Sequence, residues 1–261
     1  MLPRDLRRKL SKVNRERGTT EPADDSEIRT PHSAIRNRLE DVVPGRVHVH
    51  EHGELYVCER RIEELHLAGN DEISSAIQEV RRVGCEPGEA LFLDIETCGL
   101  ANCPLFLVGI MAQKGDEIRV QQFFARDYTE EKSLLLHLAD VLSAYRMFIT
   151  FNGKAFDIPY MRDRMIFHRL ESLAGGFEQE QFDVLHHARR LWRDTLPDCR
   201  LQTLEEHICG RRRHGDIPGH LIPELYHDFV RTGNAAPLEG VFRHNALDLI
   251  TMAELLPKVL G

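Results

Sequence analysis

The stretch ALFLDIET, residues 90–97, decides the fold, because it reads as a buried β-strand that ends in an acidic pair. Two further apolar stretches, LFLVGIMAQK at 105–114 and EIRVQQFFA at 117–125, follow it and predict a hairpin across Lys114-Gly115-Asp116. A fourth strand is predicted at 146–153, RMFITFNG. Four strands gathered in the middle of the chain indicate a β-sheet as the centre of the molecule.

Helical patterns separate and follow these strands. Five apolar residues between the hairpin and the fourth strand mark one face of a helix: Leu134, Leu135, Leu138, Val141 and Leu142. Further helical segments are predicted at about 155–169 and 183–193, and the chain from Leu201 onward is mostly helical and ends in a helix of about 237–257. This order predicts an α/β fold with a mixed central β-sheet flanked by helices.

The rest of the chain divides into two leading parts. Residues 1–45 form a polar, partly basic N-terminal arm, and residues 46–88 predict a hairpin and a connecting helix ahead of the main domain at 89–261. Leucine and valine recur at helical spacing in the arm, so one interpretation is a short amphipathic helix that docks on a partner or on phosphates. The other is a solvated, frayed terminus.

Composition excludes several classes of protein. The 261 residues are 42% hydrophobic and 29% charged, which is enough to bury a core and unlike a disordered chain. A formal charge of −8 argues against a broad basic surface that coats nucleic acid. The apolar run Leu105–Ala112 is far shorter than the roughly 20 residues of a membrane span, and six cysteines without a CxxC pair indicate a reducing compartment. We therefore expect a cytoplasmic protein without a membrane segment.

The acidic pair Asp94 and Glu96 is the first candidate for chemistry. Side chains two apart on a strand point the same way, so both carboxylates leave one face of the sheet. The spacing alone is weak, because Asp25-Ser26-Glu27 repeats it in the polar arm. Position distinguishes the first pair, since acids at the end of an apolar strand bear a desolvation cost that solvated acids avoid.

Two later acids join this pair in the sequence analysis. Asp157 follows the fourth strand in NGKAFDIP, where an N-cap role would explain it equally well. Asp248 lies four residues after His244 in the last helix, which puts the two side chains one turn apart, as in an ordinary surface ion pair. Each is ambiguous by itself, and only their order along the chain is informative.

Taken in order, the motifs D-x-E, N-x-x-x-F-D and H-x-x-x-D resemble the three exonuclease motifs of the DEDD superfamily, which has a ribonuclease H-like fold. Over about residues 46–258, the segments DIETCGL, FNGKAFDIP, FDVLHHARRLW, LPDCRLQTLEEHICG, DIPGHLIPELY and PLEGVFRHNALDL resemble the YprB-like bacterial family of that superfamily. The resemblance implies four carboxylates, Asp94, Glu96, Asp157 and Asp248, that hold two divalent cations and cut a phosphodiester bond.

Electrostatics supports a metal site independently. Two carboxylates about 4 Å apart repel by roughly 4 kcal/mol at an effective dielectric of about 20, so a cluster of four requires cations. All-oxygen ligation suits two Mg²⁺ or Mn²⁺ ions, which can activate water and stabilise the leaving oxygen. By resemblance, Asp94 bridges both ions, Glu96 and Asp157 complete the shells, and Asp248 holds the ion that activates water.

The third motif departs from the superfamily patterns. One subclass has Y-x-x-x-D and another H-x-x-x-x-D, whereas this chain places His244 at the tyrosine spacing from Asp248. We expect His244 to act as the base or to orient the attacking water, with an ordinary pKa of about 6.5.

The resemblance also implies substrate contacts near the first motif. Thr97, Gly99 and Leu100 follow the acidic pair where related enzymes seat the terminal nucleotide, and Asn152 and Phe156 are weaker candidates. Turn formation and core packing would explain the last two as well.

Two other features receive different interpretations. Asp183 resembles a family acidic position, and we assign it to helix capping and not to metal. The run Arg211-Arg212-Arg213-His214 is expected either to contact a phosphate backbone or to form a solvated loop.

The resulting hypothesis is a metal-dependent 3′-to-5′ exonuclease that hydrolyses single-stranded nucleic-acid ends, with DNA slightly favoured over RNA. One alternative is a catalytically silent module of the same fold that binds nucleic acid or a partner. The other is an endonuclease of ribonuclease H type with a similar fold and metals.

Overall fold

The protein is described by a computed structural model, which covers residues 37–174, 177 and 179–261. The predicted N-terminal arm up to residue 36 therefore lies outside the described residues. The described strands form one seven-stranded mixed sheet in the order β1-β2-β5-β4-β3-β6-β7. Their bounds are β1 Arg46–His50, β2 Gly53–Arg61, β3 Ala90–Thr97, β4 Leu105–Lys114, β5 Glu117–Phe124, β6 Met147–Thr150 and β7 Glu180–Asp183.

Strand β3 lies next to the middle strand, β4, and joins the antiparallel part of the sheet to the parallel part. It pairs antiparallel with β4 and parallel with β6, which in turn pairs parallel with β7. The C-terminal ends of β3, β6 and β7 therefore lie at the same edge of the sheet. Loops that leave this edge bring together residues that are far apart in the sequence.

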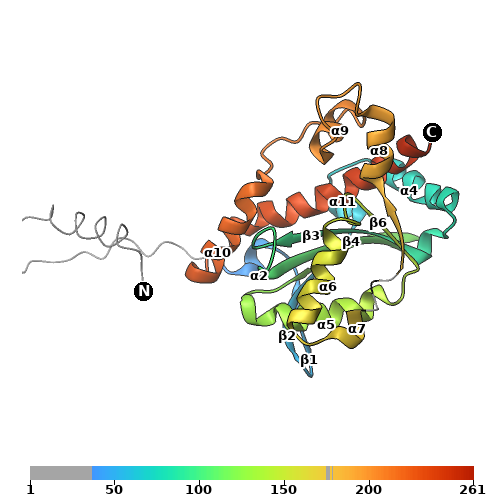
Figure 1. Ribbon diagram of the computed structural model, residues 1–261. Coiled ribbons are helices and arrows are strands. Elements are labelled where there is room, and N and C mark those ends of the chain that lie inside the picture. The colour runs from blue at the N-terminus through green and yellow to red at the C-terminus, as the bar shows by residue number, and fades with distance from the viewer. Residues whose placement is uncertain (1–36, 175–176, 178) are drawn as a thin grey trace, which may run out of the picture. The chain divides into compact units, whose positions relative to one another are not determined.

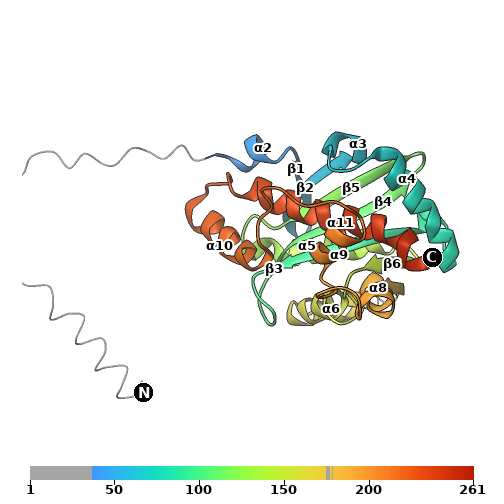
Figure 2. The same ribbon diagram turned by 90° about the horizontal axis from the view of Figure 1, so that it is seen from above.

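Helices cover both faces of the sheet (Figures 1 and 2). Figure 1 shows α11 running along one face, with α5 on the opposite side. The helix bounds are α2 Leu39–Val42, α3 Ile62–Leu65, α4 Asn70–Gln78, α5 Glu131–Leu142, α6 Asp157–Phe167, α7 Glu171–Ala174, α8 Val184–Trp192, α9 Leu201–His207, α10 Ile222–Thr232 and α11 Leu238–Leu260. Short 3-10 helices occupy Glu79–Val83, Pro87–Glu89, Tyr128–Glu130 and Gly219–Leu221. The predicted α/β fold with a mixed sheet flanked by helices is confirmed.

Alternation along β3 divides the interior into two cores. Leu91, Leu93 and Ile95 are buried in the core that includes α5 and α6. Phe92 is buried in the core that includes most of α11. Because strand side chains alternate, Asp94 and Glu96 share the face of Phe92 and point toward α11.

The hairpin formed by β1 and β2 extends the same sheet. β2 pairs antiparallel with β5 over six residues, from Tyr56 opposite Phe124 to Arg61 opposite Arg119. The last residues of the predicted polar arm pack onto it, since Leu39 and Val43 are buried and the Tyr56 hydroxyl donates a hydrogen bond of 2.7 Å to the Val43 carbonyl.

Helix α11 approaches the sheet closely at Gly109. A Cβ atom at this glycine of β4 would lie 2.0 Å from the Asn245 Oδ1 atom of α11. The same amide oxygen accepts a hydrogen bond of 2.9 Å from Gln122 of β5, and the Asn245 Nδ2 atom donates one of 2.8 Å to Asp94 of β3. Three neighbouring strands and the last helix therefore meet at a single buried asparagine.

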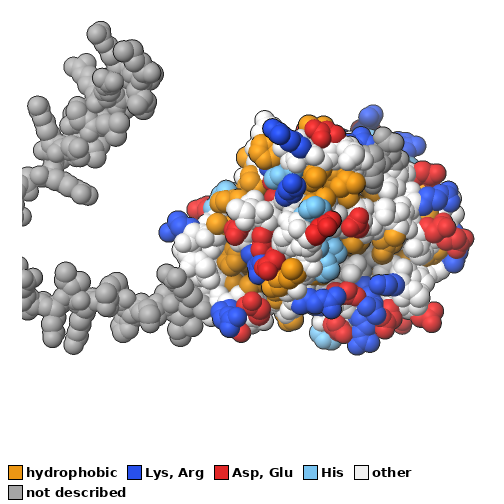
Figure 3. All heavy atoms as spheres, turned by 90° about the horizontal axis from the view of Figure 1, so that it is seen from below, with side chains coloured by type: hydrophobic (Ala, Val, Ile, Leu, Met, Phe, Trp, Pro, Cys, Tyr) orange, Lys and Arg blue, Asp and Glu red, His pale blue; other side chains and the backbone are white. Residues whose placement is uncertain are grey.

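The surface seen from below carries mixed charge. Figure 3 shows acidic and basic side chains interspersed with hydrophobic ones over this face, and a broad basic area is not visible there. None of the helices within the described ranges combines the length and the hydropathy that a membrane span needs.

Because α11 approaches the sheet so closely at Gly109, we predict that adding one methyl group there lowers the stability of the fold. Gly109→Ala should lower the free energy of unfolding by about 1–3 kcal/mol, because either Asn245 or α11 must move. Gly88→Ala is the matched control, since a Cβ there meets nothing within 4 Å. Urea unfolding of both variants would contradict this packing if Gly109→Ala were as stable as Gly88→Ala.

Candidate functional site

The acidic pair of the first motif ends strand β3. The register of β3 against β4 shifts between Glu96 and Thr97, so regular pairing stops directly after the pair. Both carboxylates are partly buried on the α11 side of the sheet. One Asp94 oxygen accepts the hydrogen bond from Asn245, and this contact orients the carboxylate.

Asp157 is placed by the turn that follows β6. Asn152 adopts a left-handed backbone with φ of 66°, a conformation that asparagine tolerates better than most residues. The chain then enters α6 at Asp157, whose side chain is only 5% exposed. Asp183 supports the turn, because its carboxylate accepts hydrogen bonds from the backbone N–H groups of Asn152 and Lys154. It also accepts one from the N–H of Leu185 and so caps α8, as predicted from the sequence.

His244 and Asp248 lie one turn apart on α11. The His244 Nε2 atom is 3.6 Å from an Asp248 carboxylate oxygen. Four carboxylates therefore lie near one another although their elements are distant in the sequence: Asp94 and Glu96 on β3, Asp157 at the start of α6, and Asp248 on α11.

The carboxylates lie near enough to one another to affect their pKa values. Burial and the charges of Asp248, Glu96 and Asp157 raise the pKa of Asp94 well above its ordinary value. Burial and the charges of Asp248 and Asp157, only partly offset by His244, raise the pKa of Glu96 to about 8. Burial, together with the charges of Asp183 and Asp248, raises the pKa of Asp157 to about 7. Burial is the largest cause for all three acids, so their ionised forms are disfavoured in this arrangement.

His244 differs from the sequence prediction. Burial lowers its pKa, but the hydrogen bond to Asp216 and the charges of Asp248 and Glu96 outweigh burial and raise the pKa of the imidazole to about 9. The expected ordinary pKa of about 6.5 is therefore wrong for this arrangement, because the acids around the ring favour its charged form.

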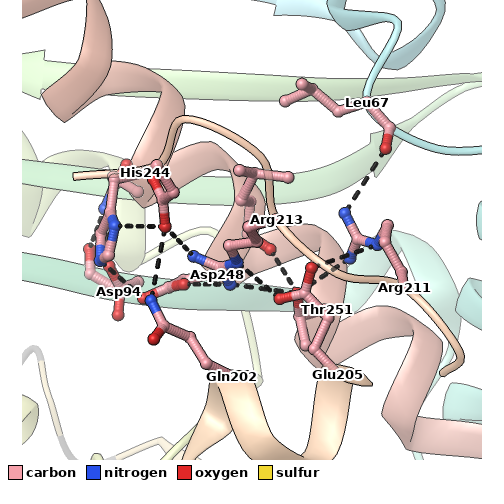
Figure 4. Close-up of polar contacts among 12 residues, drawn as sticks. Leu67, Asp94, Gln202, Glu205, Arg211, Arg213, His244, Asp248 and Thr251 are labelled. Carbon is pink, nitrogen blue, oxygen red and sulfur yellow. Dashed lines mark hydrogen bonds and ion pairs between the residues drawn. The ribbon is translucent and has the colours of Figure 1, made fainter. Parts of the chain in front are cut away.

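Arg213 is the second departure from expectation. Its side chain is 6% exposed, and its guanidinium forms ion pairs with Asp248 at 2.6 Å, Glu205 at 2.6 Å and Asp216 at 3.1 Å. Figure 4 shows Arg213 between Asp248 and Glu205, with Arg211 beyond them. Both expectations for Arg213 are wrong, because the residue is neither solvated nor free to contact phosphate. Acidic side chains from α9, from α11 and from its own loop enclose it.

The donor set fits hard divalent cations. Carboxylate oxygens are the ligands that Mg²⁺ and Mn²⁺ prefer, and the raised pKa values show a cost of ionising buried acids that such ions would offset. Within the described ranges, however, no three acidic, histidine or cysteine side chains are placed to ligate one ion together. Asp248 is engaged by Arg213 and His244, and Asp94 by Asn245.

The turn after β3 lies beside an open cleft. The Thr97 hydroxyl donates to the Gly99 carbonyl at 2.8 Å, and the Tyr160 hydroxyl donates to the same carbonyl at 3.0 Å. These bonds fix a turn from which Leu100 projects with 87% of its surface exposed. The cleft of about 440 Å³ is lined by Leu100, Ala101, Asn102, Ala155, Phe156, Pro159, Tyr160, Asp163, Arg164 and Phe167. Of the weaker substrate candidates, Phe156 lines this cleft and Asn152 forms the turn after β6.

Three polar residues of this region were not found from the sequence: Asn245, Asp216 and Tyr160. Asn245 stands next to His244 in the third motif, and Asp216 opens the segment DIPGHLIPELY, so their places in motif segments were the available signals.

Comparison with known proteins gives the relatives of this chain. The profile of the RNase H superfamily matches residues 91–260. The uncharacterized protein YprB of Bacillus subtilis (strain 168) is 35% identical over 180 residues, which make up 66% of this chain and 42% of YprB. The chain therefore spans less than half the length of this relative.

A solved structure shares the fold. The family B DNA polymerase from the hyperthermophilic archaeon Pyrobaculum calidifontis matches with a TM-score of 0.50 at 18% identity, over 66% of this chain and 24% of the polymerase chain. Together with the superfamily match, this likeness confirms the predicted ribonuclease H-like fold.

Repulsion within the cluster predicts that removing one charge stabilises the fold. Asp94→Asn keeps an oxygen that can accept from Asn245, so it should raise the free energy of unfolding at pH 8 by about 1–4 kcal/mol, as found when buried charges are replaced by neutral groups. The folded state of the wild type holds protons that the unfolded chain releases above about pH 3.8, so its stability falls as the pH rises. The gain from the substitution should therefore vanish near pH 4.

Chemical denaturation of both proteins in chelator at pH 4, 6 and 8 checks this prediction. Asp116→Asn, in the exposed turn between β4 and β5, controls for a simple change of net charge. A gain equal at all three pH values, or shared by Asp116→Asn, would show that Asp94 is not under electrostatic strain.

Proposed function

The chain belongs to the RNase H superfamily, and from this premise we propose that it is a metal-dependent 3′-to-5′ exonuclease acting on single-stranded nucleic-acid ends, with DNA favoured slightly over RNA. The observation that carries the proposal is the gathering of Asp94, Glu96, Asp157 and Asp248 beside His244, where the charge of Asp248 is among the causes that raise the pKa of each of the other three acids. Carboxylates gathered in this way can hold the divalent cations that assist phosphodiester hydrolysis.

The four carboxylates are the residues that would hold two Mg²⁺ or Mn²⁺ ions. Such ions supply positive charge against the phosphate and favour the hydroxide form of an attacking water. The chain contributes the arrangement: β3 supplies two acids on one face, the start of α6 supplies the third, and α11 supplies the fourth. Asp248 would have to exchange its contact with Arg213 for a cation.

His244 is the residue proposed to hold or move a proton beside the cluster. Its Nε2 atom lies on the side of Asp248, where an attacking water would be shared with the carboxylates. Two of the groups that raise its pKa are Asp248 and Glu96. Neutralising their charges lowers that pKa, so the imidazole becomes available as a base when the acids are compensated.

The cleft beside Leu100 is proposed to receive the terminal nucleotide. Its lining combines exposed apolar groups, Leu100 and Phe167, with the edge of Tyr160, and bases stack or pack against such groups without sequence preference. Thr97 and Gly99 hold the turn that presents Leu100. Leu100 is exposed at the edge of the cleft, so its side chain could insert between the last base and the base before it.

Time courses of cleavage test the activity. The wild type with Mg²⁺ or Mn²⁺ should shorten 5′-labelled single strands one nucleotide at a time, and Asp157→Asn or Asp248→Asn should abolish cleavage because each loses a ligand. Asp116→Asn should cut like the wild type. A ladder that appears from 3′-labelled but not from 5′-labelled strands would reverse the polarity, internal cuts would favour the endonuclease, and binding without cleavage would favour the silent module.

The exposed leucine gives a separate prediction about substrate binding. Leu100→Ala should raise KM roughly tenfold, since burying a leucine side chain contributes about 1.5–3 kcal/mol, and should leave stability unchanged. Val49→Ala is the control, because Val49 is also exposed but lies on β1 at the far edge of the sheet. Steady-state kinetics on short oligonucleotides would contradict the cleft assignment if both variants had the wild-type KM.

A further inference from the structure

His244 has a second partner on the side away from Asp248. Its Nδ1 atom lies 3.0 Å from the Oδ2 atom of Asp216, which belongs to the loop between α9 and α10 and stands 28 residues earlier in the chain. The two side chains are 9% and 7% exposed, so little water competes for this contact. The other ring nitrogen, Nε2, is then left on the side of Asp248.

The Asp216 carboxylate is itself fixed in place. Arg213 donates from Nη1 to the same Oδ2 atom at 3.1 Å, and Gln202 donates to it at 3.4 Å. Arg213 is in turn held by Glu205 and by Asp248. Asp216 therefore cannot turn away from the imidazole without also breaking its buried contact with Arg213 and its exposed contact with Gln202.

The chemistry of this contact determines which nitrogen keeps its hydrogen when the ring is neutral. The positive charges of His244 and Arg213 favour the ionised form of Asp216, which burial alone would disfavour. An ionised carboxylate only accepts hydrogen bonds, so Nδ1 must be the donor. A ring whose Nδ1–H is committed in this way presents Nε2 in one orientation, as in catalytic triads.

We propose that Asp216 is the positioning residue of His244: it fixes the imidazole so that Nε2 faces the carboxylate cluster. This inference rests on the proposed nuclease function for its catalytic consequence. Asp216 acts through His244, since its bonded oxygen is occupied by the imidazole, Arg213 and Gln202.

A double-mutant cycle separates positioning from a structural role. Asp216→Ala should lower kcat roughly 10- to 100-fold with KM nearly unchanged, the range typical of lost orienting partners. Added to His244→Ala, the same substitution should lower kcat no further, because the residue it orients is gone. Asp216→Asn keeps an acceptor oxygen and should lose less activity than Asp216→Ala.

Equal losses from Asp216→Ala in the wild-type and His244→Ala backgrounds would overturn the proposal, because they would show that Asp216 acts independently of the imidazole. Asp228→Ala is the matched control, since Asp228 is an exposed acid of α10 paired only with Arg231 at 2.7 Å among the contacts of the described chain. If Asp216→Ala fails to fold, as thermal unfolding would reveal, Asp216→Asn replaces it in the cycle.

Proton-detected NMR of ¹⁵N-histidine protein tests the contact without relying on activity. The Nδ1–H signal of His244, identified by its absence in His244→Ala, should shift or disappear in Asp216→Ala and persist in Asp228→Ala. An unchanged signal in Asp216→Ala overturns the proposal whether or not the protein cleaves. An inactive wild type with the expected NMR change would instead refute the nuclease function and leave the orientation of His244 by Asp216 established.

Discussion

The hydrogen bonds of Asn245 are the constraint on which the rest of the structure depends. This side chain, fully buried on α11, accepts from Gln122 and donates to Asp94. It can reach both because Gly109 has no side chain. A buried amide is costly unless its groups are paired, so the helix has one favourable position against the sheet. That position also sets where His244 and Asp248 lie, because they are the preceding residue and the next turn of the same helix.

The acidic cluster works against stability, and its neighbours offset part of that cost. Arg213 pairs with Asp248, Asn245 donates to Asp94, and His244 lies between Asp248 and Asp216. Buried ion pairs of this kind rarely stabilise a fold more than apolar packing would, and breaking one partner is expensive. Buried charges that lower stability in this way are typical of functional sites.

Much of this architecture could be predicted from the sequence, because it depends on local patterns. Alternation and apolar runs gave β3 through β6, the periodic leucines gave α5, and the order of the acidic motifs gave the carboxylates. Strand β7, Glu180–Asp183, was not assigned to residues, since Phe182 is its only apolar residue and the segment has no apolar run like that of β6. Arg213 looked like a solvated or phosphate-binding residue, because three adjacent arginines are usually exposed and nothing local announces Glu205 and Asp248 as partners. Asp216 received no interpretation from the sequence, because its contact with His244 exists only after α11 docks.

Three side chains on one stretch of α11 contact three different parts of the protein. His244 faces the loop that carries Asp216, Asn245 faces the sheet, and Asp248 faces both Arg213 and the cluster. Because residues 244, 245 and 248 share a rigid helix, a rotation or shift that weakens the Asn245 contacts also displaces the imidazole and the carboxylate. The geometry of the site therefore depends on the packing of α11 against the sheet. A substitution can disturb this site from the sheet side, through Gly109 or Gln122, without touching an acidic residue.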